Sequence, residues 1–353
     1  MKSPSLAGEG LGLGLSHRPL LLELHHPFRL ALGVRTHTNA VLTELRCEGQ
    51  VGYGEAAMPP YYGETHATAA AFLDRAAAVL KGKNYPFDLP GLMAEIDALA
   101  PGNHAAKAAV DIALHDLWGK LENRPVWQLL GGIEPEQMPR TSFTIGMDTP
   151  DMLRQKVAEA SGFQILKIKL GSDDDRAIIR TIREVSDLPI YADANQGWTD
   201  REAALDLIYW LAEHNVQLVE QPCPKDDLDA AAWLSARSPL PIIADERFQR
   251  YADLDQVADA YHGLNIKLMK CTGIAEAYRI AQTARQRGLK ILLGCMTETS
   301  CGIQAAAQIA PLCDYADLDG CWLIRNNPFA VPVLQDGKIQ LGEAAGLGLN
   351  SLD

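Results

Sequence analysis

Paired cysteines and long apolar runs are missing from this sequence. Its seven cysteines are odd in number and form no C-x-x-C motif, so the sequence predicts neither a disulfide framework nor a zinc ribbon. No apolar run reaches the roughly 18–20 residues that a membrane span requires. The amino terminus also lacks an apolar segment followed by a small-residue cleavage site. These absences favour a cytoplasmic protein with no membrane partner.

Positive charge is scarce as well. The chain of 353 residues carries 32 Lys and Arg against 45 Asp and Glu, which gives a formal net charge of −13. Nucleic acids and anionic membranes are bound through clustered Lys and Arg, so we expect no nucleic-acid partner. The composition fits a small anionic or zwitterionic substrate, and a homo-oligomer is left open.

The first part of the chain predicts an α+β unit. The glycine-rich stretch "GEGLGLGLSHRP" lacks the G-x-G-x-x-G spacing and follows no strand, so we interpret residues 1–15 as a flexible leader rather than a nucleotide loop. From residue 16 to 57, two alternating apolar runs are separated by "CEGQ", which is typical of a hairpin turn. Helical periodicity follows to about residue 135. The tail, residues 331–353, contains a second hairpin signal at Asp336-Gly337 and is expected to return to this N-terminal sheet.

Between residues 136 and 330, short apolar strands alternate with amphipathic helices. Successive strands start about 22–28 residues apart, and eight parallel strands of this kind close most naturally into a TIM-type barrel. An open doubly wound sheet is less favoured, because no Gly-rich first turn marks a phosphate site. The predicted fold class is α/β: a (β/α)7β barrel with an α+β capping domain, residues 16–135, completed by the tail. The expected barrel strands are 142–147, 164–170, 188–194, 216–221, 241–246, 263–269, 290–296 and 314–319.

Carboxylates stand at the ends of three consecutive barrel strands. Catalytic groups of a barrel lie on this carboxyl-terminal face, and Asp193, Glu220 and Asp245 follow one another at intervals of 27 and 25 positions. An all-oxygen set from rigid strands suits Mg²⁺, and no His or Cys accompanies it to suggest zinc. Each acid alone could cap a helix or pair with a lysine, but three in register favour a metal site.

Lysines flank these acids. Lys167 and Lys169 belong to the second strand and Lys267 to the sixth, so in a closed barrel Lys169 and Lys267 lie four strands apart with the acids between them. Taken singly, Lys167 or Lys270 would more often be a strand lysine with its ammonium group in water. Lys267 is the only charge on its face of the strand, because its neighbours two positions away are uncharged.

This set suits proton transfer next to a carboxylate. Removing the proton α to a carboxylate builds a second negative charge on its oxygens, which a divalent cation stabilises. A base is also required, and a lysine near Mg²⁺ and a second lysine is expected to have a lowered pKa. Two bases on opposite faces permit removal of the proton on one side and its return on the other, which is racemisation or epimerisation.

The sequence resembles the enolase superfamily, in its muconate-lactonising subgroup, and within that subgroup the dipeptide epimerases. The resemblance covers nearly the whole chain through "AAKAAVDIALHDLWGK", "LKIKLG", "YADANQGW", "VEQP", "IADE", "NIKLMK" and "ADLDG". It implies an isomerase with Mg²⁺ as cofactor, bound by Asp193, Glu220 and Asp245. It further implies that Lys169 and Lys267 are the acid/base pair and that Lys167 lies beside the substrate carboxylate.

The motif "DYADLDG", with Asp317 and Asp319, makes the resemblance to dipeptide epimerases more specific than that to other members of the subgroup. Both alternate onto one face of the last strand, and similar pairs in dipeptide epimerases hold the α-ammonium of the substrate. Such a pair would repel a succinyl group. The aspartates could instead cap a helix or pair with Arg325. For the reaction, N-acylamino acid racemisation and cycloisomerisation stay open as alternatives. A non-catalytic binder is disfavoured, because both lysine bases and all three metal-binding acids are present. The resemblance also implies substrate-lining positions at Thr144, Cys295 and Thr297.

One position departs from the Ala-Glu epimerases. These commonly carry an arginine after the "PF…AL" stretch to meet the glutamate side chain, whereas this chain has Gly33 there. The expected substrates are therefore dipeptides with neutral or hydrophobic side chains, and Arg35 is the open alternative for an acidic one. The loop 58–66, with Tyr61 and Tyr62, is interpreted either as a lid over the mouth or as an ordinary turn set by its two prolines.

Overall fold

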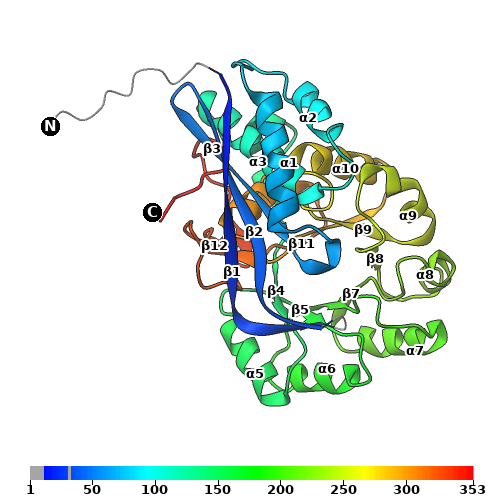
Figure 1. Ribbon diagram of the computed structural model, residues 1–353. Coiled ribbons are helices and arrows are strands. Elements are labelled where there is room, and N and C mark those ends of the chain that lie inside the picture. Colours follow the sequence, from blue (N-terminus) through cyan, green and yellow to red (C-terminus); the bar gives the residue numbers. More distant parts are fainter. Residues whose placement is uncertain (1–11, 31–32, 353) are drawn as a thin grey trace.

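The computed structural model describes residues 12–30 and 33–352 (Figure 1). The interpretation of the first residues as a leader therefore lies outside the described residues up to position 11. Positions 14 and 15 already belong to the first strand, β1 (Gly14–Leu30), so the ordered sheet begins earlier than predicted.

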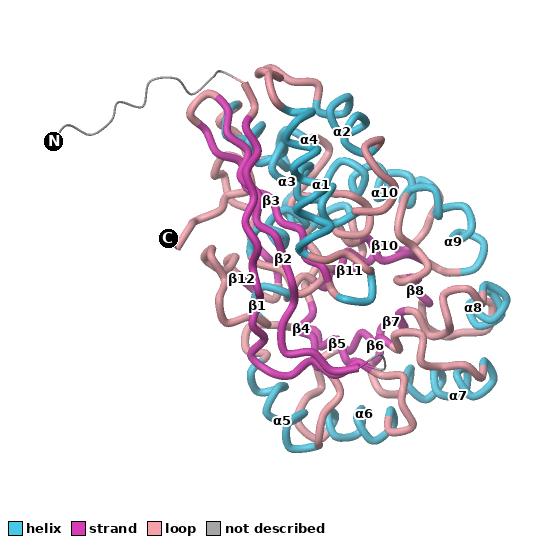
Figure 2. The backbone as a smooth tube through the Cα atoms, viewed as in Figure 1, coloured by secondary structure: helices cyan, strands magenta, loops and turns pink. Residues whose placement is uncertain are grey.

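Three antiparallel strands form the N-terminal sheet, in the order β1, β2 (Gly33–Cys47) and β3 (Gln50–Met58). The predicted turn joins β2 to β3, where Glu48 and Gly49 have φ angles of 47° and 77°, as a two-residue type I′ turn requires. β1 and β2 are long, and their far ends extend from the sheet across to the barrel (Figure 2). This long hairpin brings N-terminal side chains to the mouth of the barrel.

The capping helices are α1 (His66–Leu80), α2 (Leu89–Asp97), α3 (His104–Leu121) and α4 (Val126–Leu130). Helix α3 packs directly on β3, because two strand glycines allow close approach. A Cβ atom at Gly52 would lie 2.2 Å from the carbonyl oxygen of Ala113, and one at Gly54 would lie 1.9 Å from that of Ala109. Only glycine fits at such distances.

In the described part of the chain, eight parallel strands form the second sheet, and a bridge between Thr141 and Ala316 joins its two edges. Helices surround the strands (Figures 1 and 2), and the last strand is followed by the short 3₁₀ turn Gly320–Trp322. The predicted (β/α)7β barrel is confirmed. Its strands are β4 (Ser142–Ile145), β5 (Ile165–Lys169), β6 (Ile190–Asp193), β7 (Val216–Glu220), β8 (Ile242–Ala244), β9 (Gly263–Ile266), β10 (Lys290–Gly294) and β11 (Tyr315–Asp317), and its helices are α5 (Pro150–Glu159), α6 (Asp175–Arg183), α7 (Arg201–Ala212), α8 (Leu228–Ser235), α9 (Leu254–Ala260), α10 (Ile274–Gln286) and α11 (Ser300–Ala307).

The barrel strands are shorter than predicted. β8 and β9 end before Asp245 and Lys267, which are the first residues of the following loops. Leu268 and Met269, further along the loop after β9, are still buried. The apolar pattern therefore continues past the last ladder hydrogen bond and overestimates strand length.

The tail returns to the capping helices rather than to the edge of the N-terminal sheet. Its hairpin, β12 (Leu334–Gln335) and β13 (Lys338–Ile339), lies where predicted and contacts residue 141 through Gly337. Beyond it, Val126 donates to the carbonyl oxygen of Gly346, and Leu347 donates to a carboxylate oxygen of Asp116 in α3.

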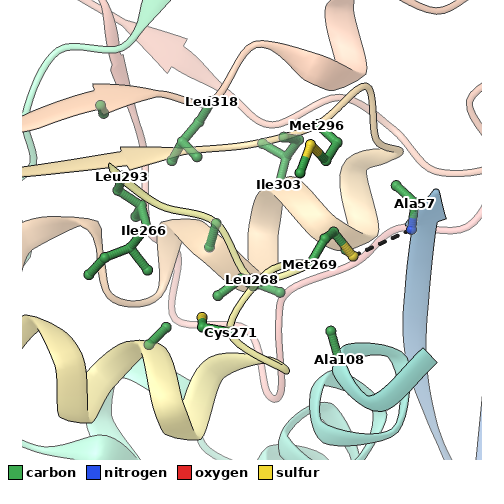
Figure 3. Close-up of a cluster of buried hydrophobic side chains, with 14 of the residues drawn as sticks. Ala57, Ala108, Ile266, Leu268, Met269, Cys271, Leu293, Met296, Ile303 and Leu318 are labelled. Carbon is green, nitrogen blue, oxygen red and sulfur yellow. Dashed lines mark hydrogen bonds between the residues drawn. The ribbon is translucent and has the colours of Figure 1, made fainter. Parts of the chain in front are cut away.

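One continuous apolar core joins the capping domain to the barrel. Figure 3 shows the contact, where Ala57 at the end of β3 donates to Met269 Sδ at 3.4 Å. Nearby, the buried carboxylate of Glu55 accepts from the backbone nitrogens of Thr299 and Gly302 at the start of α11. The sheet is thereby fixed over the mouth.

None of the helices in residues 12–30 and 33–352 combines the length and the apolar character of a membrane span. The cysteines are free thiols, and Cys295, the only one that is not fully buried, lies at the mouth.

Candidate active site

Three carboxylates stand side by side at the carboxyl ends of neighbouring barrel strands. Asp193 ends β6 and is in register with Lys169 of β5 on one side and with Glu220, the last residue of β7, on the other. Asp245 directly follows β8. The three acids are 0%, 0% and 2% exposed, so they lie inside the mouth rather than on the surface.

Two lysines approach these acids from opposite walls. Lys169 Nζ lies 2.5 Å from Asp193 Oδ2, and Lys267 Nζ lies 2.7 Å from Asp245 Oδ2. Their strands, β5 and β9, are four positions apart in the sheet order. A molecule held between the two walls would meet one ammonium group on each of its faces.

Lys167 occupies the centre of the cluster. Its Nζ lies 2.6 Å from Glu220 Oε2, 2.7 Å from Asp317 Oδ2 and 3.1 Å from Asp193 Oδ2. Lys167 and Lys270 are each only 1% exposed. The alternative of a strand lysine with its head in water is therefore wrong for both.

The balance of charge differs between the acids. Burial raises the pKa of Asp193, but the positive charges of Lys169 and Lys167 outweigh burial and lower that pKa to about 2. Burial and then the negative charge of Asp193 raise the pKa of Glu220 to about 7, despite Lys167. Negative charge is thus only partly compensated around Glu220.

Mg²⁺ fits these residues. All donors are carboxylate oxygens, the ligand type that Mg²⁺ takes, and Glu220 Oε2 is buried with no hydrogen-bond partner, since its 2.6 Å contact with Lys167 lacks hydrogen-bond geometry. In the described part of the chain, no group of three or more His, Cys, Asp or Glu side chains is arranged to hold a metal ion directly. Each of the three carboxylates contacts at least one lysine, so metal binding would exchange these ion pairs for metal contacts.

The pKa of Lys267 differs from the expectation. Burial lowers it, but the negative charges of Asp245 and Glu220 outweigh burial and raise it well above its ordinary value. The lowered pKa was expected from the positive charges of Mg²⁺ and a second lysine. Among the protein's own groups, the negative carboxylates have the larger effect on the pKa of Lys267.

Asp317 and Asp319 meet at Thr144 of β4. Asp317 Oδ1 accepts hydrogen bonds from Ser142 Oγ at 2.7 Å and from Thr144 Oγ1 at 3.3 Å. Asp319 Oδ2 accepts one from the backbone nitrogen of Thr144 at 2.5 Å. Although Asp319 lies beyond the end of β11, the two carboxylates share one side of the mouth.

The two alternatives for these aspartates do not fit. Asp319 precedes the 3₁₀ turn but makes no capping hydrogen bond with its side chain, and Arg325 donates to the carbonyl oxygen of His25 instead. Burial and the negative charge of Asp317 raise the pKa of Asp319 to about 7. A cationic group beside the pair would offset this repulsion.

Side chains of the capping domain cover the mouth. Arg35 of β2 donates from Nη2 to Thr297 Oγ1 at 2.9 Å, and its guanidinium carbon lies 5.3 Å from the centre of the Phe28 ring. Arg35 Nε and Nη1 are buried and have no hydrogen-bond partner among the described residues. Buried polar groups are nearly always bonded, so these two donors point to an acceptor that the described residues do not supply.

The loop 58–66 also reaches the mouth, through the 3₁₀ helix η1 (Pro60–Tyr62). Tyr61 lines the mouth and its hydroxyl lies 4.0 Å from Met296 Sδ. Burial and then the negative charge of Asp245 raise the pKa of Tyr62 well above its ordinary value. Of the two interpretations of this loop, the position fits a cover over the mouth.

The mouth encloses about 40 Å³ and brings together the predicted catalytic and substrate residues. Phe28, Met296 and Leu323 were not predicted to line it, because in the sequence they look like ordinary core residues. The lining residues are Phe28, Arg35, Tyr61, Thr144, Lys167, Lys169, Lys267, Cys295, Met296, Thr297, Asp317, Asp319 and Leu323.

Two supporting residues were also missed. Asn265 donates to Glu220 Oε1 at 2.7 Å, and Lys270 donates to Asp245 Oδ1 at 2.6 Å and to the Asp245 carbonyl oxygen at 2.7 Å. Asn265 lies two positions before Lys267 on a buried strand. A polar residue on the inner face of such a strand was the signal that could have predicted its role.

Comparison with known proteins gives relatives over nearly the whole length. Residues 18–131 match the family model of the mandelate racemase / muconate lactonizing enzyme N-terminal domain, and residues 151–352 match the enolase C-terminal domain-like family. An L-Ala-D/L-Glu epimerase of Bacteroides thetaiotaomicron is 48% identical over 97% of this chain and 89% of that protein. A hydrophobic dipeptide epimerase of Enterococcus faecalis is 36% identical over 93% of this chain and 96% of that protein. A crystal structure of a dipeptide epimerase from Enterococcus faecalis, complexed with Mg and L-Leu-L-Tyr, superimposes with a TM-score of 0.88 at 34% identity and covers 96% of this chain and 99% of that one.

Proposed function

The chain belongs to the mandelate racemase / muconate lactonizing enzyme family of enolase-like proteins, and we propose that it is a Mg²⁺-dependent dipeptide epimerase. The reaction moves the α-proton of the C-terminal residue of a dipeptide from one face of the α-carbon to the other. The observation that carries the proposal is the placement of Lys169 and Lys267 on opposite walls of one carboxylate cluster. The location in the cytoplasm and the lack of nucleic-acid and membrane partners stay predictions.

The carboxylate cluster prepares the substrate for loss of its α-proton. Asp193, Glu220 and Asp245 are the residues that would hold Mg²⁺, which, when bound, stabilises the second negative charge that develops on the substrate carboxylate. Lys167 adds a fixed positive charge in the same place, since its ammonium group is buried among three carboxylates.

The two lysines carry the proton. A neutral Lys169 or Lys267 accepts the α-proton at its Nζ on one face, and the ammonium group of the other lysine donates a proton to the opposite face of the same carbon. The reverse reaction exchanges the two roles. The dipeptide gains and loses one proton, so no further reactant is required.

The aspartates at Thr144 bind the amino end of the dipeptide in this proposal. Asp317 and Asp319 are buried and close together, and a charge-assisted hydrogen bond from an α-ammonium group to each carboxylate would relieve their repulsion. An N-acylated substrate has no ammonium group to offer. This contrast favours free dipeptides over N-acylamino acids.

Arg35 leads us to revise the expected side-chain preference. The sequence predicts neutral or hydrophobic dipeptides because Gly33 stands in place of an arginine, but the guanidinium group of Arg35 reaches the mouth from two positions further on, with two buried donors unused. A carboxylate side chain on the C-terminal residue would accept a hydrogen bond from either of these donors. We therefore propose dipeptides with a C-terminal Glu or Asp as preferred substrates.

The proposal is tested by incubating the protein with Mg²⁺ and single dipeptides in D₂O and following the α-proton of each residue by NMR. Deuterium at the α-carbon of the C-terminal residue, together with formation of the other epimer, supports it. Exchange confined to N-acylamino acids such as N-succinyl amino acids would exclude it. Comparison of Ala-Glu with Ala-Leu tests the role of Arg35 separately, because a dipeptide epimerase without an acidic preference would turn over Ala-Leu at least as well.

A further inference from the structure

The mouth is too small for a whole dipeptide. Its volume of about 40 Å³ holds only a few water molecules, at roughly 10–15 Å³ each on this measure. A neighbouring cavity of about 320 Å³ shares Phe28, Thr144 and Leu323 with the mouth. The two spaces therefore adjoin at these three residues, and the neighbouring cavity has the volume for substrate atoms that the mouth lacks.

This second cavity lies on the outer side of barrel strand β4. Thr144 bonds the two aspartates on the inner side of the strand, so Phe143, the preceding residue, points to the outer side. The cavity is bounded by β1 (His25, Phe28) and by Glu159, the last residue of α5.

Aromatic rings form part of the cavity walls. The rings of Phe143 and Phe163 have centroids 5.1 Å apart, and those of Phe163 and Trp322 have centroids 5.5 Å apart in an edge-to-face arrangement. Leu24 and Leu323 add aliphatic surface. Such walls favour apolar and aromatic groups.

Two charged side chains along the cavity already have polar partners. Lys156 pairs with Asp148 at 2.9 Å, and Glu159 pairs with His26 at 2.6 Å. Neither of these lining residues, Lys156 or Glu159, lacks a hydrogen-bond partner within the protein. A neutral group is therefore the occupant that fits.

The cavity lies next to the aspartates that suit an α-ammonium group. Asp317 and Asp319 both bond Thr144, and Thr144 also lines the cavity. The side chain of an N-terminal residue is attached to the same carbon as the ammonium group. We propose that this cavity binds the side chain of the N-terminal residue and that it takes apolar side chains up to the size of Phe; this inference rests on the proposed function.

The first experiment compares Phe-Glu with Ala-Glu on the wild-type protein with Mg²⁺, using the NMR assay of epimerisation. We expect kcat/KM for Phe-Glu to equal or exceed that for Ala-Glu, and a lower value for Phe-Glu overturns the inference. Phe-Leu and Ala-Leu repeat the comparison with a neutral C-terminal residue, so the result does not depend on Arg35. If no dipeptide is epimerised, the proposed function itself has failed, which is a different outcome.

The second experiment removes one wall of the cavity with Trp322→Ala. We expect the ratio of kcat/KM for Phe-Glu to that for Ala-Glu to fall about tenfold, chiefly through KM, and Trp322→Phe to restore most of it. Trp233→Ala is the matched control, because Trp233 of α8 stacks with Arg201 and Arg237 and lines neither the mouth nor the second cavity. An unchanged ratio in a folded Trp322→Ala variant overturns the inference. If that variant does not fold, the wild-type comparison of Phe-Glu with Ala-Glu still decides.

Discussion

At the scale of single residues, the two lysines have separate tasks because each reaches only one face of a bound α-carbon. We expect Lys169→Ala and Lys267→Ala each to lower the epimerisation rate by about 10²–10⁴-fold, the usual contribution of a general acid or base. The remaining lysine can still exchange the proton on its own face. In D₂O, each variant should therefore exchange one epimer faster than the other, as followed by NMR on the separate epimers.

Lys290→Ala is the control for both variants. Lys290 is exposed, begins β10 at the end of the barrel opposite the mouth, and pairs there with Asp314. It should keep wild-type rates. Full epimerase activity in either Lys169→Ala or Lys267→Ala would show that the two lysines are not the acid/base pair.

Arg35 offers a second residue-scale prediction. Hydrogen bonds to charged groups contribute about 1.5–3 kcal/mol, so Arg35→Met should lower kcat/KM for Ala-Glu by about 10–100-fold. Ala-Leu should be affected much less. The control is Arg29→Met, since Arg29 is an exposed residue of the same hairpin. Equal losses on Ala-Glu and Ala-Leu would mean that Arg35 supports the fold of the hairpin rather than the substrate side chain.

Ionised residues of the site could be predicted from the sequence, and its apolar lining could not. A charge directly at the end of a buried strand, such as Lys267, has few structural reasons to be there, so its position alone indicates chemistry. Phe28 and Leu323 carry no such signal, because an apolar residue in a mouth and one in a core have the same pattern. Arg35 lay between these cases, since its direction depends on how the long hairpin crosses the barrel.

At the scale of elements, alternation and spacing predict the strands, but close backbone contacts decide how elements pack. The tail was expected at the N-terminal sheet and lies instead on α3 and α4. A Cβ atom at Gly119 of α3 would lie 2.5 Å from Gly346 Cα, so two glycines make this contact possible. Nothing in apolar periodicity marks such a pair in advance.

The contact between β3 and α3 leads to a prediction at the same scale. Gly54→Ala would place a methyl group 1.9 Å from the carbonyl oxygen of Ala109, which forces the strand and the helix apart. We expect a loss of about 1–3 kcal/mol in the free energy of unfolding, measured by urea denaturation. Gly14→Ala is the matched control, because a Cβ atom there meets nothing within 4 Å. Equal stability of the two variants would contradict this account of the packing.

At the scale of the whole molecule, the carboxylate cluster couples metal binding to stability. A ligand that binds only the folded state stabilises it in proportion to RT ln(1 + [L]/Kd), so Mg²⁺ should raise Tm above the value in EDTA by several degrees. Glu220→Gln removes one proposed ligand and should abolish most of this shift. Glu95→Gln is the control, since Glu95 pairs with Lys83 on the surface. A full Mg²⁺ shift in Glu220→Gln would remove Glu220 from the metal site.

The junction between capping domain and barrel should make stability depend on pH. Burial and then the negative charge of Glu55 raise the pKa of Glu298, in the loop after β10, to about 8, whereas an unfolded glutamate titrates at about 4.3. Between these values the folded protein holds one more proton than the unfolded chain, so this group lowers the free energy of unfolding as the pH rises.

Glu298→Gln has no proton to lose at this position. Its stability relative to the wild type should therefore increase steadily from pH 5 to pH 8, by an amount on the order of a few kcal/mol. Urea denaturation of both proteins at several pH values measures the difference. Glu64→Gln is a useful comparison, because Glu64 caps α3 away from this junction through Ala105 and Ala106. Parallel pH profiles of the free energy of unfolding for wild type and Glu298→Gln would mean that Glu298 is ionised in the folded protein. A positive charge or water would then have to reach this junction, which the packing of β3 against α11 otherwise closes.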